Sequence, residues 1–300
     1  MSLHKLEQLK VDQDLTSAIS TIMKTIQLTA GVERIDIVWT CEIIGTGMST
    51  TVSNFGGPSM NLQISPSGGP DFINANLLAL AGIKQQFSNG TVMKETLSAT
   101  SHKRVFALRF DPGMNAGDEF LGIDDGYEQL NIRLELLTTN DVKIGSPSGT
   151  ITSIHVTGSI NVHMNTNEND SKGYRQYILD QFGIDAKDSN TRVRRTLQSK
   201  RDIDSLLLMN PVDPAIIKSI KILRDTNLEQ YEDFVEVGKT ISEQVYNIAD
   251  YVLFDPIEMI ETGENSVIEF ELGTVSSSTQ IQFLTHYLFY EKEEPKTEKK

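Results

Sequence analysis

The chain has 300 residues, of which 41 are acidic and 27 are basic, and its formal net charge of −14 at pH 7 argues against bulk nucleic-acid binding, which needs a basic face. The length corresponds to about two domains, each able to bury a core of its own. The single cysteine, Cys41, excludes an intrachain disulfide, and no apolar run approaches the roughly 20 residues of a membrane-spanning helix.

The first 24 residues are predicted to form a helical arm. Residues 3–23 place Leu15, Ile19 and Met23 on one side of a helix, and Asp14 is a plausible cap for it. This arm would precede the first domain.

From residue 25 onward the hydrophobic period changes to two, which is typical of half-buried strands. Between Ile35 and Ile43, apolar residues alternate with polar ones, and this alternation places Trp39 and Cys41 in the core. Further strands are expected at residues 60–64, 91–99, 104–110 and 129–139, and residues 71–82 are expected to form a short helix that ends at Gly82.

A long strand closes the first half of the chain. Even positions between Ile154 and Met164 are apolar, whereas the odd positions carry polar residues, including His155 and His163. Gly158 interrupts the apolar face, as expected where a strand bends, bulges or lets another backbone come close. Residues 165–173 are turn formers, so they predict the seam between two domains.

The second half repeats this plan. It begins with helix-like residues 173–183, continues through several strands, and closes with alternating apolar residues between Ile281 and Phe289. The prediction is an all-β protein with two tandem jelly-roll β-sandwiches, a double jelly roll, plus the N-terminal helix and short helices in loops. The predicted domains are residues 25–167 and 168–291, followed by a disordered charged tail at 292–300.

Catalytic patterns are lacking. The five histidines form no metal-binding spacing, and there is no glycine-rich phosphate loop or nucleophile elbow. No catalytic or cofactor-binding residue is therefore assigned, and the chain is not expected to be an enzyme. One loop offers hard oxygen ligands suited to calcium, at Asp124, Asp125 and Glu128, although a solvated turn explains the same residues.

A basic stretch stands out in this acidic chain. Five cationic residues fall within ten positions, namely Arg192, Arg194, Arg195, Lys200 and Arg201. They are candidates for contact with an acidic neighbouring subunit, a phospholipid head group or a nucleic acid. The alternative is an ordinary solvated strand edge, because basic residues also protect edges from unwanted pairing.

The order and spacing of these elements resemble the double jelly-roll major capsid proteins of icosahedral viruses with an internal membrane. That lineage includes the tectiviruses, the corticoviruses and the adenovirus hexon, and the resemblance is greatest to compact bacteriophage members of the corticovirus or Flavobacterium lipid-phage type. The stretches that carry it are "INANLLALAG", "RVFALRFDPG", "LNIRLELLTT", "AIIKSIKILRDTNLEQYEDFVEV", "KTISEQVYNI" and "STQIQFLTHYLFYEK".

This resemblance implies a structural role. Such proteins form pseudo-hexameric homotrimers that tile the virus shell, so the implied partners are a second and third copy, neighbouring trimers, penton or minor capsid proteins, and viral membrane lipid. The implied location is the virion, after synthesis in the host cytoplasm. The alternative function is a carbohydrate- or receptor-binding β-sandwich protein, such as a phage spike or lectin-like protein, and a jelly-roll glycosidase ranks third.

Overall fold

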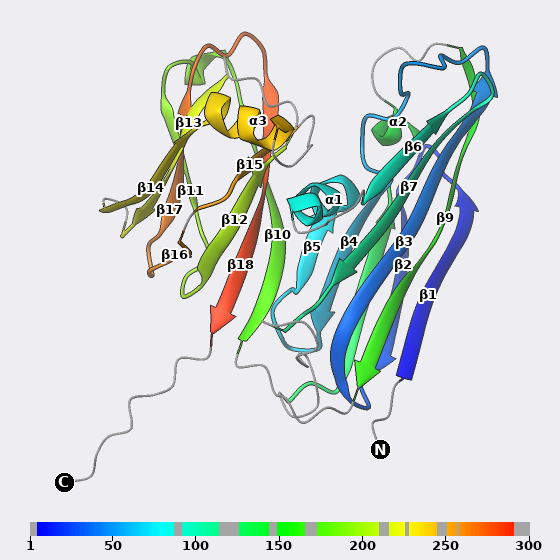
Figure 1. Ribbon diagram of the computed structural model, residues 1–300, viewed down its shortest axis with the longest axis horizontal. Helices are drawn as coiled ribbons and strands as arrows, with labels where there is room; N and C mark the ends of the chain where they lie inside the picture. Colours follow the sequence, from blue (N-terminus) through cyan, green and yellow to red (C-terminus); the bar gives the residue numbers. More distant parts are fainter. Residues whose placement is uncertain are drawn as a thin grey trace.

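A computed structural model describes most of the chain, and strands dominate it (Figure 1). The described residues are 5–86, 92–113, 126–143, 149–165, 173–209, 216–225, 228–244, 251–256 and 258–290. Within them the strands form three sheets, which pack as two β-sandwiches side by side. The all-β prediction with two sandwiches is therefore confirmed.

One face of the first sandwich is a sheet that we call the first sheet. Its described strands are, in spatial order, β1 (Lys5–Asp14), β9 (Thr150–Asn165), β3 (Gly31–Thr46), β7 (Ser101–Phe110) and β6 (Met93–Leu97). Each neighbouring pair is antiparallel. In β3, buried residues alternate with more exposed ones, as the period-two pattern predicts.

A second sheet, the shared sheet, belongs to both sandwiches. Its first-half strands are β2 (Ser20–Gln27), β8 (Gln129–Leu136), β4 (Met60–Pro66) and β5 (Ile73–Asn76). The order then continues with β10 (Gly173–Ile184), β18 (Thr279–Tyr290), β12 (Asp202–Leu208) and β15 (Val252–Phe254), while β16 (Ile260–Glu261) also pairs with β12. The link is a short parallel pairing, in which Tyr177 lies opposite Ile73.

The second sandwich is completed by the distal sheet. It contains β11 (Arg192–Thr196), β17 (Val267–Leu272), β13 (Ile217–Arg224) and β14 (Leu228–Phe234). A separate apolar cluster fills the space between this sheet and the second-half strands of the shared sheet. Each half of the chain thus has its own core, but the boundary at residue 167 stays a prediction because residues 166–172 lie outside the described residues.

Short helices lie in the connections, as expected: α1 (Leu77–Gln86), α2 (Thr139–Val142), α3 (Val235–Gln244) and a 3-10 turn (Ala186–Asp188). The Oδ1 atom of Asn76 accepts a hydrogen bond from the Ala79 amide and so caps α1. The prediction that Gly82 ends this helix is wrong. A Cβ atom at Gly82 would come within 2.7 Å of Leu207 Cδ2, so this glycine lets α1 pack against β12 of the other sandwich (Figure 1).

The predicted N-terminal helical arm is also wrong. Residues 5–14 form β1, which pairs with β9 along its full length, and residues 20–27 form β2. Leu9 and Val11 are buried while Lys10 and Asp12 are exposed, which is the alternation of a strand. The apolar residues at helical spacing were misleading, because Ile19 and Met23 are exposed.

The helix expected at residues 173–183 is a strand as well. β10 pairs with β18 through all of its 12 residues, so the backbone hydrogen bonds come from a segment about 100 positions away. The predicted closing strand of the second half is confirmed as β18, and the predicted tail at 292–300 lies outside the described residues.

The first core is organised around Trp39 on β3. Its ring is fully buried, its Nε1 donates a hydrogen bond to Ser59 Oγ at 2.9 Å, and the neighbouring Cys41 is buried as expected. Gly158 of β9 lies directly opposite Trp39 in the sheet. A Cβ atom there would lie 2.5 Å from both the Trp39 ring and the Val38 carbonyl oxygen, so the predicted close approach at this glycine is confirmed.

None of the helices in the described part of the chain combines the length and the apolar character needed to span a bilayer.

Candidate functional site

The outward face of the first sheet carries polar networks that connect its strands. His155 and His163 both lie on this face of β9, as their parity predicts. They contact different acidic groups, His155 next to Asp12 and His163 next to Asp36.

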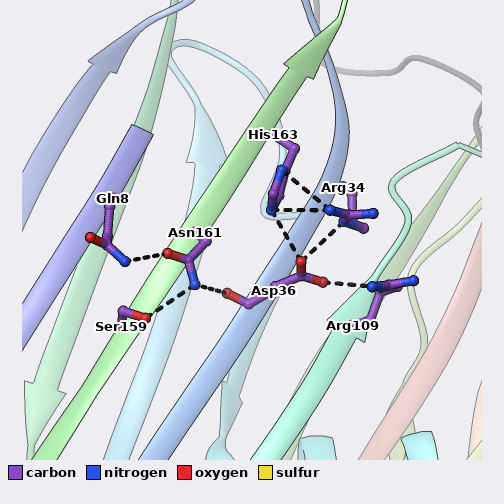
Figure 2. Close-up of polar contacts among 7 residues, drawn as sticks. All are labelled: Gln8, Arg34, Asp36, Arg109, Ser159, Asn161 and His163. Atoms are coloured by element: carbon purple, nitrogen blue, oxygen red, sulfur yellow. Dashed lines mark hydrogen bonds and ion pairs between the residues drawn. The ribbon is translucent and has the colours of Figure 1, made fainter. Parts of the chain in front are cut away.

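The network around His163 is centred on Asp36 of β3 (Figure 2). Its carboxylate accepts a hydrogen bond from Arg109 Nε at 3.1 Å. Arg34 Nε lies 3.0 Å from Oδ2 and His163 Nε2 lies 3.1 Å from the same oxygen. Three strands, β9, β3 and β7, are thereby joined through one carboxylate. The sequence shows that Asp36 points outward, but the partner strands and their register depend on the tertiary structure.

The same face holds the edge strand β1 in place. Gln8 Nε2 donates to Asn161 Oδ1 at 2.6 Å, and Asn161 Nδ2 donates to Ser159 Oγ at 3.1 Å (Figure 2). Lys24 of β2 donates to the Gln8 carbonyl oxygen at 2.7 Å, which connects the edge of the shared sheet to the edge of the first sheet. A lysine at this position also discourages pairing with a foreign strand.

His155 forms the second network, near the end of β1. Its Nδ1 lies 2.8 Å from Asp14 Oδ1 and its Nε2 lies 3.0 Å from Asp12 Oδ1. The contact with Asp14, reinforced by the one with Asp12, raises the pKa of His155 above its usual value. The protonated ring therefore links β9 to β1 through two carboxylates.

This network predicts a pH-dependent contribution to stability. Because the pKa of His155 is higher in the folded state, its contribution is fully present below about pH 6.5, the ordinary histidine value, and is lost as pH rises through the raised pKa. His155→Gln should therefore lower the melting temperature in acidic buffer and have little effect in alkaline buffer. Thermal unfolding of both proteins across this pH range checks it, and a difference that does not change with pH would contradict it.

Between the two networks, the outward residues of the three central strands β9, β3 and β7 are uncharged. Val38 lies opposite Ala107 and Ser159, and Thr40 lies opposite Thr157. Val38 is 48% exposed even though it lies on a central strand of the sheet. An uncharged centre with a charged rim is the anatomy of a protein interface.

The basic stretch does not form a single surface patch. Arg192 and Arg194 share one face of β11, as expected, and they contact the acidic residues of β17. Arg194 Nε donates to Glu269 Oε2 at 2.7 Å, and Arg192 Nη1 lies 3.5 Å from Glu269 Oε1. Glu269 is almost fully buried, so these arginines supply positive charge next to a carboxylate that is removed from water.

The other three cations have separate surroundings. The Arg195 guanidinium lies 4.2 Å from the centre of the Phe182 ring, and that of Arg201 lies 4.1 Å from the centre of the Phe289 ring. Arg201 also donates to Gln176 Oε1 and to the Tyr174 hydroxyl. Lys200 is exposed in a turn with a φ of 57°. Arg195 and Arg201 thus have structural roles within the chain.

The calcium candidates are only partly visible. Asp124 and Asp125 lie outside the described residues, and Glu128 is exposed, with its carbonyl oxygen accepting from the Leu28 amide at 2.9 Å. Across the described ranges, no group of three or more histidine, cysteine or acidic residues could hold a metal ion. The calcium hypothesis stays a prediction.

A groove of about 620 Å³ lies along the shared sheet and is lined by both halves of the chain. Amide side chains dominate its lining: Asn61, Gln63, Asn74, Asn76, Gln181 and Gln282. The acids that line it are engaged, since Arg133 contacts Glu135 at 2.5 Å and Asp141 caps α2. This groove therefore offers amide hydrogen bonding rather than a pair of carboxylates ready for acid–base chemistry.

The chain matches no protein-family model and no curated protein sequence. Solved structures, in contrast, match nearly all of it. The major capsid protein (MCP) of Sulfolobus turreted icosahedral virus (STIV) superposes with a TM-score of 0.63 at 11% identity, over 95% of this chain and 97% of that one. The major capsid protein P2 of bacteriophage PM2 gives 0.53 at 10% identity, over 97% and 99%.

The Faustovirus major capsid protein gives a TM-score of 0.50 at 9% identity, over 96% of this chain and 90% of that one. At such low identity the likeness concerns the fold, and both sandwiches take part in it because the coverage is almost complete. The resemblance drawn from the order of the elements is confirmed at this level: the chain has the double jelly-roll fold found in viral major capsid proteins.

Proposed function

We propose that this chain is the major capsid protein of an icosahedral virus and has no enzymatic role. The observation that carries the proposal is the match over 95% or more of the chain to major capsid proteins that are themselves covered over 90% or more. A jelly-roll domain in a protein with a different function would match only part of such capsid proteins, or its chain would contain additional elements. The proposed location is the virion.

The physical features support a shell subunit. The two sandwiches share one continuous sheet, and cross-strand networks hold the edge strand β1. The outward face of the first sheet has an uncharged centre suited to a lateral contact. We propose that homotrimers form first and then contact neighbouring trimers and penton or minor capsid proteins.

An internal membrane beneath the shell is part of the proposal. The predicted N-terminal helical arm is not available for a membrane contact, because residues 5–14 form β1. Lipid contact is therefore proposed without an assigned segment among the described residues.

For the contacts between subunits we propose the basic stretch, Arg192, Arg194, Arg195, Lys200 and Arg201. Three of these side chains, Arg192, Arg194 and Lys200, are exposed on the second sandwich and are the first to test. Arg192 and Arg194 leave part of their guanidinium groups accessible, at 60% and 48% of the side-chain surface. An acidic surface of a neighbouring copy is the expected partner, given the net charge of −14.

Light scattering after size exclusion tests the assembly. The expected mass is three times the 33.4 kDa of the chain, and a monomer at every concentration would contradict the capsid proposal. Arg192→Glu should shift the mass toward the monomer, whereas Lys187→Glu, on the exposed turn that precedes β11, should not. A trimer that tolerates Arg192→Glu would refute only the assigned contact, and dissociation by a calcium chelator would support the acidic loop as a metal site.

The alternative of carbohydrate binding has no structural observation in its favour. Its usual platform is a solvent-facing aromatic side chain, but Trp39 is fully buried. Among the described residues, Phe234 is the aromatic side chain that is prominently exposed, at 57%.

A further inference from the structure

The joint between the two sandwiches contains a cluster of ionisable side chains around two buried rings. We define the joint cluster as Lys84 on α1, Asp111 after β7, Arg175 and Tyr177 on β10, Asp204 on β12 and His286 on β18. Tyr177 and His286 are buried and the other four are partly buried. Interiors exclude ionisable groups unless they are paired, so a cluster where the two halves meet calls for a physical explanation.

His286 lies at the centre of the cluster. It is fully buried, its Nδ1 lies 2.9 Å from Asp204 Oδ2, and its ring stacks on Tyr177 with the ring centres 4.6 Å apart and the planes 6° from parallel. The side chain of Tyr177 is therefore held on one face by a histidine of the second half.

The first half of the chain holds Tyr177 from its other sides. The rings of Phe72 and Phe110 meet it edge-on, with ring centres 6.0 Å and 5.0 Å away. The Lys84 ammonium lies 5.0 Å from the centre of the Phe110 ring and 5.8 Å from that of Tyr177. Tyr177 is thus the side chain through which α1 and β7 contact the imidazole of His286.

Apolar contacts surround the cluster. Leu207, Leu284 and Leu253, all from the second half of the chain, belong to the core of the first sandwich. Leu207 also packs against α1 at Gly82. Opening the joint would expose these side chains, so closure is favoured as long as the polar cluster inside it is balanced.

The charged groups that act on His286 are the cations Lys84 and Arg175 and the anion Asp204. Lys84 is attracted in turn by Asp111 and repelled by Arg175 and Arg109. Burial lowers the pKa of Lys84 to about 8 despite the attraction of Asp111. Burial likewise lowers the pKa of His286, although Asp204 acts in the opposite direction.

We propose that the joint cluster is an acid-sensitive hinge, in which uptake of a proton by His286 loosens the packing of the second sandwich on the first. A protonated ring would be a third cation beside Lys84 and Arg175 in a closed joint where Asp204 is the one anion that acts on it. In an opened joint, the same cation would be hydrated. Acid therefore favours the open arrangement, and this inference does not depend on the chain forming shells.

The sign and size of the effect follow from linkage. His286 binds a proton less tightly in the closed joint than an ordinary exposed histidine, with a pKa of about 6.5, would. Between those two pKa values, each unit of acidification raises the ratio of open to closed molecules by up to about tenfold. Above about pH 6.5, titration of His286 should not change the ratio of open to closed molecules.

Spin labels placed on the two sandwiches measure the opening directly. Thr96→Cys on β6 and Lys218→Cys on β13 are exposed sites. The native Cys41 stays unlabelled because it is buried, and burial raises its pKa to about 12. The labelled full-length chain is diluted with unlabelled chain, so that the measured distances lie within one subunit. Pulsed electron paramagnetic resonance then gives the distance between the labels at about pH 7.5 and at about pH 5, on either side of the ordinary pKa of histidine.

We expect one distance population at neutral pH and a second, longer one in acid. His286→Gln should remove the acid population. His102→Gln is the matched control, because His102 is equally buried but lies within the first sandwich, where it contacts the Asn54 amide and the Ser49 carbonyl oxygen. It should respond to acid like the unmodified chain.

Two further variants keep the test decisive if His286→Gln does not fold. Lys84→Met removes a cation that lowers the pKa of His286 in the closed joint, so the acid population should become smaller. Asp204→Asn removes the anion that raises this pKa, so the acid population should become larger. Unchanged distances in acid, changes in these two variants that are absent or in the same direction, or an opening that coincides with loss of the β-sheet circular dichroism signal would overturn the proposal.

Discussion

Gly158→Ala is expected to destabilise the first sandwich by about 1–3 kcal/mol, the usual cost of overpacking a well-packed core, or by more because a backbone atom is involved. The added Cβ atom would lie 2.5 Å from the Val38 carbonyl oxygen and 2.5 Å from the Trp39 ring. The ring can shift, but the carbonyl belongs to the paired strand β3 and cannot move without disturbing the sheet. Denaturant unfolding at a fixed protein concentration measures the loss.

Gly183→Ala provides the matched control. Gly183 also lies within a long strand, β10, but a Cβ atom there would meet no atom within 4 Å. This substitution should be neutral or slightly stabilising, because alanine has less backbone freedom to lose on folding. Trp39→Phe combined with Gly158→Ala should not restore full stability, since the clash with Val38 remains. Equal stabilities of Gly158→Ala and Gly183→Ala would contradict the account.

Arg194→Ala is expected to have the second large effect, a loss of about 1–2 kcal/mol. Removing one partner of a fully buried ion pair costs about 3–5 kcal/mol, and the half-exposed position of Arg194 reduces this figure. Its removal leaves the buried Glu269 carboxylate with the more distant Arg192 as its arginine partner. Denaturant unfolding again supplies the measurement.

Arg133→Ala is the control for exposure. The side chain of Arg133 is 48% exposed, as is that of Arg194, but its partner on β8, Glu135, keeps 27% of its side-chain surface accessible to water. That substitution should cost less than about 1 kcal/mol. The double variant Arg194→Ala with Glu269→Leu should recover stability relative to Arg194→Ala, because no buried charge is left behind. A loss in Arg133→Ala as large as in Arg194→Ala would count against burial as the cause.

Local sequence patterns were sufficient to predict a strand where that strand has one buried face. The alternation in β3 and β9 identified those strands, placed Trp39 and Cys41 in the core, and put His155 and His163 on the outside. Gly158 was recognisable as a close approach because it interrupts an otherwise apolar face. These features depend on the period-two geometry of a strand, in which successive side chains point to opposite faces, so they can be read from the residues of that strand alone.

Local sequence patterns predicted the wrong secondary structure where apolar residues have helical spacing but the backbone pairs with a distant strand. Residues 5–14 became β1 because β9 supplies backbone partners for all of them, and residues 173–184 became β10 for the same reason through β18. No local pattern contains the identity of a partner strand about 100 or more positions away. Tertiary pairing therefore overrides a weak helical preference.

The sequence by itself determined the all-β character, the two-part plan, the buried aromatic core and the lack of recognisable catalytic motifs. The tertiary structure alone decided which polar groups meet. It placed Asp36 among two arginines and a histidine, buried Glu269 beneath Arg192 and Arg194, and brought Lys84 and His286 to the same joint. The physical reason is that parity gives the side of a strand on which a residue lies, whereas the register and the packing of one sandwich on the other give its neighbours.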